Sequence, residues 1–320
     1  MTFTPCECGR WRTCELIGDT TGPACPKDSS AAAALGFAAG DLPAFRFRAR
    51  GTGDTMTVHT AQLDGRAAAA AELAPLAFAG YAHFTAAQVR GGRIRGLDLH
   101  LNRLREASEQ LFGRALPDDR VREFLRAALA ASPADVSLTA TVFSRPGEFV
   151  ATGADLSVLV RTGAPAAGPA GPLALAAVEY ERPLARVKHV GEVAKTYYLR
   201  RAVQQGFDDA AFVDREGRLS EATIWNLAFW DGDSVVWPRA GMLPGTTMGI
   251  VRRQLDRLGV PQRTGDIASR DLPGLRGAVV MNSWTPAVSV HRIGAITLPA
   301  APDFVELLHR SYAEEPLVVP

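Results

Sequence analysis

Strands and helices follow one another irregularly along this chain, and that order most constrains its fold. A hairpin is predicted around Gly91-Gly92, where strand-like residues flank a two-glycine turn. Segment 98–113 then repeats apolar residues at helical spacing, with Asp98 placed to cap the helix and Gly113 to end it. Strict strand–helix alternation is missing, and no GxGxxG follows a strand. The pattern therefore predicts an α+β fold with segregated helices.

The remaining pattern predicts two domains joined by an Ala/Gly/Pro-rich linker. Further helices are expected over 118–131, 192–205, 246–258 and 304–313, and strands over 136–143, 155–161, 173–180, 210–214, 218–223, 226–230, 235–237, 277–282 and 288–293. The expected parts are a poorly patterned, disordered extension (1–55), a small domain (56–163), the linker (164–171), a larger strand-rich domain (172–300) and a C-terminal helix and tail (301–320).

Composition excludes several functional classes. Lys+Arg 35 against Asp+Glu 34 gives a net charge of +1, which favours neither nucleic acid nor a membrane surface. No apolar run approaches the length of a membrane span. The four cysteines, at positions 6, 8, 14 and 25, lack the paired spacing of a zinc site, so we expect no metal. A body without further cysteines is typical of a cytoplasmic protein.

The chain contains only three lysines, Lys27, Lys188 and Lys195. Lys188 lies among apolar and β-branched residues that predict a strand, where a desolvated amine can act as a nucleophile. Glu221 follows 33 residues later in an alternating strand, where a carboxylate needs a cationic partner. Pyridoxal phosphate chemistry asks for both, a lysine Schiff base and an acid against the ring nitrogen. Lys195 is the competing lysine, but its helical context predicts exposure.

Three segments have the character of anion-binding elements. Arg103 sits at the apolar seam of the 98–113 helix, where its fork suits a phosphate, although a snorkelling arginine would fit as well. Gly245-Thr246-Thr247 leads into a helix, whose amides favour anions, although threonine is also an ordinary cap. Asn282-Ser283 ends a strand with small polar residues, which is common in loops.

Taken in order, these motifs resemble those of the fold type IV pyridoxal-phosphate enzymes, the class IV aminotransferase family. That family includes branched-chain and D-amino-acid aminotransferases, aminodeoxychorismate lyases and (R)-selective amine transaminases. The resemblance spans about residues 57–295 and rests on HLNRL at 100–104, the lysine, SEATIWNL at 220–227, LPGTT at 243–247 and the Asn-Ser turn.

The resemblance implies a role for each matching residue. Lys188 would form the Schiff base with pyridoxal 5'-phosphate and move the proton, and Glu221 would pair with the pyridine nitrogen. The residues implied to bind the phosphate are Arg103, Thr246, Thr247, Asn282 and Ser283. The resemblance also implies a homodimer.

Some positions depart from the family pattern. Met248 stands where many members carry an arginine, and Val193 lies where branched-chain enzymes place a tyrosine. Tyr81 and His83 are candidates for the substrate pocket, although Tyr81 would fit as a packed core aromatic residue and a histidine such as His83 is often structural.

We expect an aminotransferase that moves an amino group between an amino acid or primary amine and a 2-oxo acid. Two alternatives remain open. An aminodeoxychorismate lyase-like enzyme is favoured by Lys188-His189, and a degenerate cofactor-binding homologue is favoured by the departures.

Overall fold

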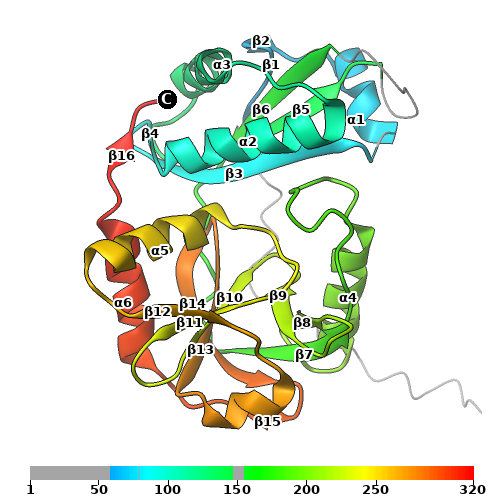
Figure 1. Ribbon diagram of the computed structural model, residues 1–320. Coiled ribbons are helices and arrows are strands. Elements are labelled where there is room, and N and C mark those ends of the chain that lie inside the picture. Colours follow the sequence, from blue (N-terminus) through cyan, green and yellow to red (C-terminus); the bar gives the residue numbers. More distant parts are fainter. Residues whose placement is uncertain (1–57, 79, 147–154) are drawn as a thin grey trace, which may run out of the picture. The chain divides into compact units, whose positions relative to one another are not determined.

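The computed structural model describes residues 58–78, 80–146 and 155–320, and its described elements are mixed helices and strands arranged around two sheets (Figure 1). The α+β fold predicted from the sequence is confirmed. The predictions for residues 1–55 and for the cysteines lie outside the described residues.

The first sheet is antiparallel, and two helices cover one of its faces (Figure 1). Its strand order in the described part of the chain is β16 (Leu317–Val318), β4 (Arg93–Arg95), β3 (Ala82–Arg90), β5 (Val136–Ser144), β6 (Leu156–Gly163), β1 (Val58–Leu63) and β2 (Arg66–Ala67). The helices are α2 (Leu97–Phe112) and α3 (Asp118–Ala130), and their apolar faces share one core with the sheet. Two short helical segments, η1 (Ala70–Leu73) and α1 (Ala74–Phe78), precede β3.

Strand β3 separates that core from the site. Successive side chains of a strand point to opposite faces. On the helix-facing side, Thr85 Oγ1 shares a hydrogen bond of 2.7 Å with His100 Nδ1 on α2, and Val89 is buried in the core. Phe84 therefore points the other way, where its ring meets the amine of Lys188.

The second sheet closes on itself as a small barrel. Its strands are β7 (Leu173–Glu179), β8 (Asp209–Val213), β9 (Leu219–Ala222), β10 (Asn226–Trp230), β11 (Val235–Pro238), β12 (Gln262–Gly265), β13 (Gly277–Asn282), β14 (Thr285–Ile293) and β15 (Ile296–Thr297). The ring runs β10-β13-β14-β7-β8-β9 and is completed by pairing of β9 with β10, where Glu221 lies opposite Asn226. Buried apolar side chains such as Leu219, Leu227 and Phe229 form its core.

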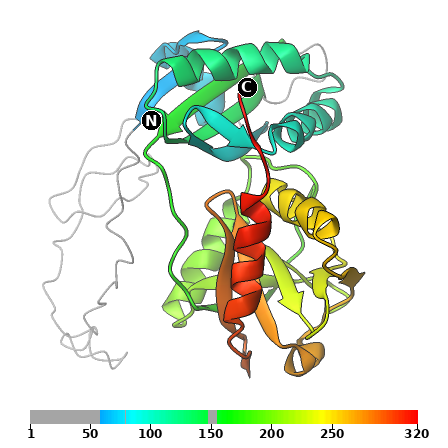
Figure 2. The ribbon, with the colours of Figure 1, turned by 90° about the vertical axis from the view of Figure 1, so that its left-hand side faces the viewer.

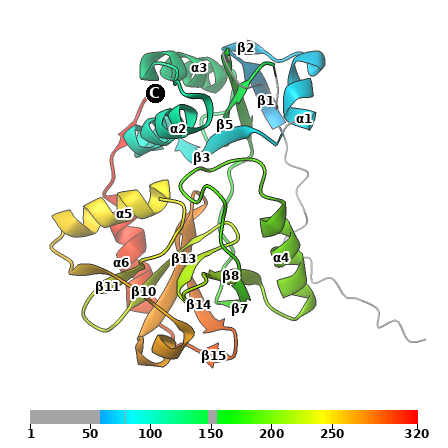
Figure 3. The ribbon, with the colours of Figure 1, turned by 45° about the vertical axis from the view of Figure 1, so that its right-hand side comes forward.

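Helices pack on the outside of this barrel. Helices α5 (Thr246–Arg257) and α6 (Pro302–Ala313) share a second apolar cluster with strands β10, β11, β13 and β14, and Figure 2 shows α6 alongside them. Helix α4 (Val193–Gln204) packs on β7 and β8, as Figure 3 shows. The 3₁₀ segment η2 (Ser269–Gly274) precedes β13. After α6 the chain returns to the first sheet as β16.

Most predicted elements are present, but α2 and β14 differ from the prediction at their starts. Helix α2 ends at Gly113 as predicted, but Asp98 does not cap it, because Gly96 occupies the cap position in a left-handed conformation. Asp98 instead accepts a hydrogen bond of 2.7 Å from Arg253. Strand β14 begins at Thr285, three residues before the predicted start, because Thr285 pairs with Asn282 across the turn.

Two buried histidines, His83 on strand β3 and His100 on helix α2, make acid sensitivity an expected property. Burial lowers the pKa of His83 to about 4 and that of His100 to about 3. Both values lie below the ~6.5 of an unfolded chain. The unfolded state therefore binds more protons between these values, so stability falls as the pH drops from 6.5 toward 4. The loss is on the order of 3 kcal/mol per histidine.

Urea unfolding between pH 7.5 and 4.5 measures this loss. His83→Gln, which keeps a polar partner for Ser108, is expected to be less sensitive to acid than the parent protein. His59→Gln is the matched control, since His59 is exposed. Equal acid sensitivity of the parent and His83→Gln would contradict the prediction.

Candidate active site

Lys188 lies in the segment between β7 and α4, which runs alongside β3. The Phe84 N–H donates a hydrogen bond of 2.8 Å to the Lys188 carbonyl, and the Val190 N–H donates one of 2.9 Å to the Ala82 carbonyl. The prediction that Lys188 belongs to a strand was wrong. Only a single bridge, between His83 and His189, forms here, and the chain then enters α4.

The amine of Lys188 sits in an apolar and cationic environment. Its Nζ lies 4.8 Å from the centroid of the Phe84 ring. The pKa of Lys188 is lowered to about 7, chiefly by burial and then by the positive charges of Arg103, Lys195 and Arg182, while Glu221 opposes them. A large fraction of this amine is therefore neutral at neutral pH, which a nucleophile or proton acceptor requires.

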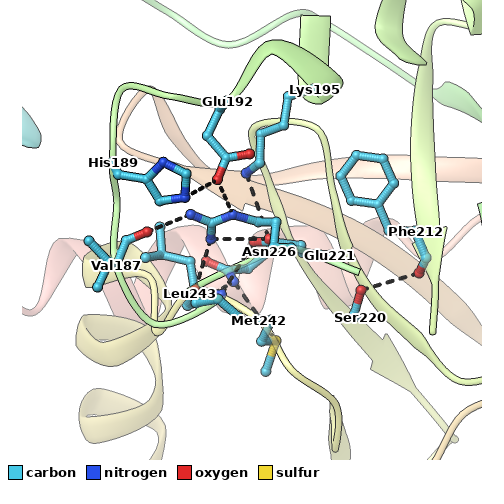
Figure 4. Close-up of polar contacts among 12 residues, drawn as sticks. Val187, His189, Glu192, Lys195, Phe212, Ser220, Glu221, Asn226, Met242 and Leu243 are labelled. Atoms are coloured by element: carbon cyan, nitrogen blue, oxygen red, sulfur yellow. Dashed lines mark hydrogen bonds and ion pairs between the residues drawn. The ribbon is translucent and has the colours of Figure 1, made fainter. Parts of the chain in front are cut away.

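Glu221 is buried at the barrel seam and accepts bonds from three directions. Its side chain is 4% exposed. Oε1 lies 3.3 Å from the Arg182 guanidinium and 3.6 Å from Lys195 Nζ, and Oε2 accepts a bond of 3.4 Å from the Leu243 N–H. Figure 4 shows Lys195 reaching Glu221 from the α4 side. These are long bonds, so the carboxylate retains capacity for a further donor.

Arg182, which the sequence did not single out, connects this carboxylate to the lysine segment. Its side chain is 2% exposed. Nη1 donates to Glu221 and to the Ala185 carbonyl at 2.8 Å, Nη2 donates to the Val187 carbonyl at 2.5 Å, and Nε donates to Glu192 at 2.6 Å. Arg182 thereby holds the backbone at Ala185 and Val187, just before Lys188, close to Glu221. The one feature of the sequence that pointed to such a residue was Glu221, because a buried carboxylate requires a cationic partner.

The expected exposure of Lys195 was also wrong. Its side chain is 13% exposed and turns inward from the first turn of α4 to Glu221. Glu192, just before that helix, accepts bonds from Arg182 and from His189 Nε2 at 2.9 Å. Burial opposes the ionisation of Glu192, but these two donors outweigh it and lower its pKa to about 2.

Arg103 approaches the site from α2. Its Nη2 donates a bond of 2.8 Å to the Pro244 carbonyl, immediately before the LPGTT glycine. Burial lowers the pKa of Arg103 to about 10, and the charge of Arg182 acts in the same direction. Among the described residues no carboxylate forms an ion pair with Arg103. A half-buried guanidinium without an acidic partner is suited to an anionic ligand.

Thr246 and Thr247 are buried in the first turn of α5, with Gly245 as the cap residue. Any side chain at Gly245 would collide with Asn226, because its Cβ atom would overlap the Asn226 amide oxygen. Thr247 Oγ1 donates a bond of 2.9 Å to the Asn282 carbonyl, which ties α5 to the turn after β13. The threonines and Asn282 are thus brought together near the carbonyl that Arg103 binds.

The other predicted residues make contacts outside this cluster. Ser283, in the same turn, borders a cavity of about 290 Å³ that Gln88 and Tyr312 also line. His83 faces α2, where its Nε2 shares a hydrogen bond of 2.8 Å with Ser108. The Tyr81 hydroxyl donates a bond of 2.6 Å to the Leu111 carbonyl at the end of α2. The structure therefore does not bring the two pocket candidates to the Lys188 amine.

Comparisons with known proteins identify the family and the fold of this chain. The family described as amino-transferase class IV matches residues 82–293. Solved structures with the same fold include a putative 4-amino-4-deoxychorismate lyase from Legionella pneumophila (TM-score 0.69, 19% identity, 77% of this chain and 95% of that one). They also include a branched-chain aminotransferase from Thermoproteus uzoniensis with norvaline (TM-score 0.69, 18% identity, 80% and 93%). No curated protein matches the chain significantly in sequence.

A third solved structure carries the cofactor. It is the PLP-bound form of a hypothetical aminotransferase from Mycobacterium tuberculosis (TM-score 0.63, 21% identity, 76% of this chain and 92% of that one). The chain belongs to the class IV aminotransferase family.

The residues present fit pyridoxal 5'-phosphate, the cofactor of this family. Three cationic side chains, Arg103, Arg182 and Lys195, and the partly protonated Lys188 lie around two carboxylates, Glu192 and Glu221, so the site has an excess of positive charge that a phosphate would balance. No cluster of three or more metal-binding side chains occurs in the described part of the chain. Within the same residues, no helix combines the length and apolar character needed to cross a membrane.

Proposed function

We propose that this protein is an aminotransferase that moves an amino group between an amino acid or primary amine and a 2-oxo acid. The observation that carries the proposal is the half-buried amine of Lys188, with a pKa lowered to about 7, beside the buried acid Glu221. An amine that is partly neutral at pH 7 can attack a carbonyl and then accept and return a proton.

Each predicted site residue would serve one part of the reaction. Lys188 would hold the cofactor covalently and move the proton at the substrate carbon, and Glu221 would hold the proton on the pyridine nitrogen. Bound pyridoxal phosphate supplies the electron sink for the carbanion at that carbon. The proposed phosphate-binding residues are Arg103, Thr246, Thr247, Asn282 and Ser283. The first four converge through the Arg103–Pro244 and Thr247–Asn282 contacts.

The test uses the two half-reactions separately. The protein loaded with pyridoxal phosphate is mixed with a panel of amines, and the visible absorbance of the cofactor is followed. Loss of the band with one amine, and its return with one 2-oxo acid, supports amino-group transfer. A loaded protein that responds to no amine favours the degenerate homologue instead.

The second candidate is a lyase of the aminodeoxychorismate type. The Lys188-His189 pair favours it, as in the lyase branch that the sequence resembles. The two reactions differ in their need for an acceptor. Release of pyruvate from the substrate without any added 2-oxo acid would identify the lyase and exclude transfer as the main reaction.

Assembly and location also belong to this proposal. We propose that the protein is a cytoplasmic homodimer. Each protomer would consist of a small and a larger domain, divided at the linker 164–171. Val193 and Tyr197 on α4 are exposed apolar side chains one helical turn apart, which supports a further contact there. Sedimentation velocity at two protein concentrations measures the state of assembly.

Replacing Arg103 tests the phosphate site. Arg103→Met is expected to weaken pyridoxal phosphate binding by about 10- to 100-fold, the loss of one charge-assisted hydrogen-bonding partner. Pyridoxal, which lacks the phosphate, should bind both proteins alike. Equilibrium titration by absorbance measures both ligands.

Arg105→Met is the matched control for that titration. Arg105 lies on the same helix but pairs with Asp118 at 2.7 Å, and its side chain is 41% exposed. Its loss should leave both affinities unchanged. Equal weakening of pyridoxal and pyridoxal phosphate by Arg103→Met would show that Arg103 does not act through the phosphate.

A further inference from the structure

Two of the chain's three lysines are associated with the same buried carboxylate. Lys195 Nζ lies 3.6 Å from Glu221 Oε1, and its side chain is largely buried. Lys188, seven residues earlier, is near enough for the charges of both Lys195 and Glu221 to act on its amine. Only three of the 35 lysine and arginine residues of the chain are lysines, and two of these three lie at this site.

We propose that Lys195 is a positioning residue of the site, whose ammonium ion pairs with Glu221 and thereby keeps the neighbouring Lys188 amine neutral and reactive. This inference rests on the proposed function, in which Lys188 is the nucleophile. It assigns the two lysines distinct roles, one held as the charged partner of Glu221 and one partly neutral.

The geometry distinguishes the two amines. Burial lowers the pKa of Lys195, but Lys195 has a carboxylate within ion-pair distance, which favours its protonated form. Lys188 lies over the Phe84 ring and forms no ion pair within the described residues. A free Glu221 would attract a proton to Lys188, so a cation bound to Glu221 weakens that attraction. A cationic neighbour is an established way to activate a lysine.

The other charged groups around Lys188 come from three elements. Arg103 lies on α2, and Arg182 lies in the lysine segment and binds Glu221 at 3.3 Å. His189 and Glu192 bind one another at 2.9 Å at the start of α4. Lys195→Gln removes the ammonium that pairs with Glu221 and leaves a neutral polar side chain in its place, so it tests the effect of this one charge on Lys188.

The experiment is lysine-selective NMR on the protein without cofactor. With ¹³Cε-labelled lysine the full chain has only three lysines to report, Lys27, Lys188 and Lys195. A titration from pH 5 to 11 then measures the pKa of Lys188 directly. In the parent protein it should lie near 7. In Lys195→Gln it should rise by about 1 or more, as expected for loss of one nearby like charge.

Two further variants separate the pair from general effects. Lys195→Arg keeps the cation and should keep the low pKa of Lys188. Arg200→Gln removes one charge from the exposed side of the same helix and should have no effect. An unchanged Lys188 pKa in Lys195→Gln, or an equal rise in Arg200→Gln, would overturn the proposal.

A second measurement distinguishes this inference from the proposed function. Pyridoxal phosphate is added, the adduct is reduced with borohydride, and peptide mass spectrometry locates it. An adduct on Lys188 supports both proposals. An adduct on Lys195 overturns the division of roles and leaves the cofactor chemistry intact. No adduct, with the NMR shifts as expected, overturns the function and leaves the lysine pair standing.

Discussion

Lys188→Ala is expected to abolish covalent capture of pyridoxal phosphate and to lower amino-group transfer by at least about 10³-fold. Removing a covalent nucleophile that also moves the proton has effects of this size or larger. The visible absorbance of the bound cofactor should revert to that of free pyridoxal phosphate. The Lys188 side chain is only half-buried, so folding should be preserved.

Lys195→Ala provides the comparison for that variant. It retains Lys188 and should still capture the cofactor, with a slower reaction at neutral pH. Thermal unfolding of both variants controls for stability. Capture that survives in Lys188→Ala and disappears in Lys195→Ala would reverse the assignment of the nucleophile.

Arg182→Met is expected to destabilise the protein by about 3–5 kcal/mol, the usual result of removing one partner of a buried ion pair. The guanidinium satisfies Glu221, Glu192 and two loop carbonyls, and all lose a donor together. Denaturant unfolding measures the loss. Because Arg182 also holds the Lys188 segment, the variant should capture pyridoxal phosphate more slowly even where it remains folded.

Arg186→Met is the matched control, since Arg186 lies in the same loop but is exposed. Its effect should stay within about 0.5 kcal/mol. Arg182→Lys keeps the charge but cannot reproduce the forked geometry, so it should recover only part of the stability. Similar unfolding free energies for Arg182→Met and Arg186→Met would refute the role assigned to Arg182.

Local patterns predicted the elements that carry the site. Gly113 ends α2, and Thr246 begins α5 after a glycine, because helix termini depend on a few adjacent residues. The order of the motifs from Arg103 to Asn282 predicted the family, which matches residues 82–293. The helix ends and the motifs each depend on neighbouring residues in the sequence, so they can be recognised without the tertiary structure.

The sequence by itself also required a cation for the buried Glu221, but it did not identify which residues supply one. Arg182 and Lys195 meet this carboxylate because the pairing of β9 with β10 closes the barrel and α4 turns its first residues inward. His83 turned away from Lys188 because it lies on the helix-facing side of β3. The sequence alone thus determined the elements, the family and the candidate nucleophile. Only the tertiary structure decided which side chains share one acid, because such contacts join segments that local patterns describe separately.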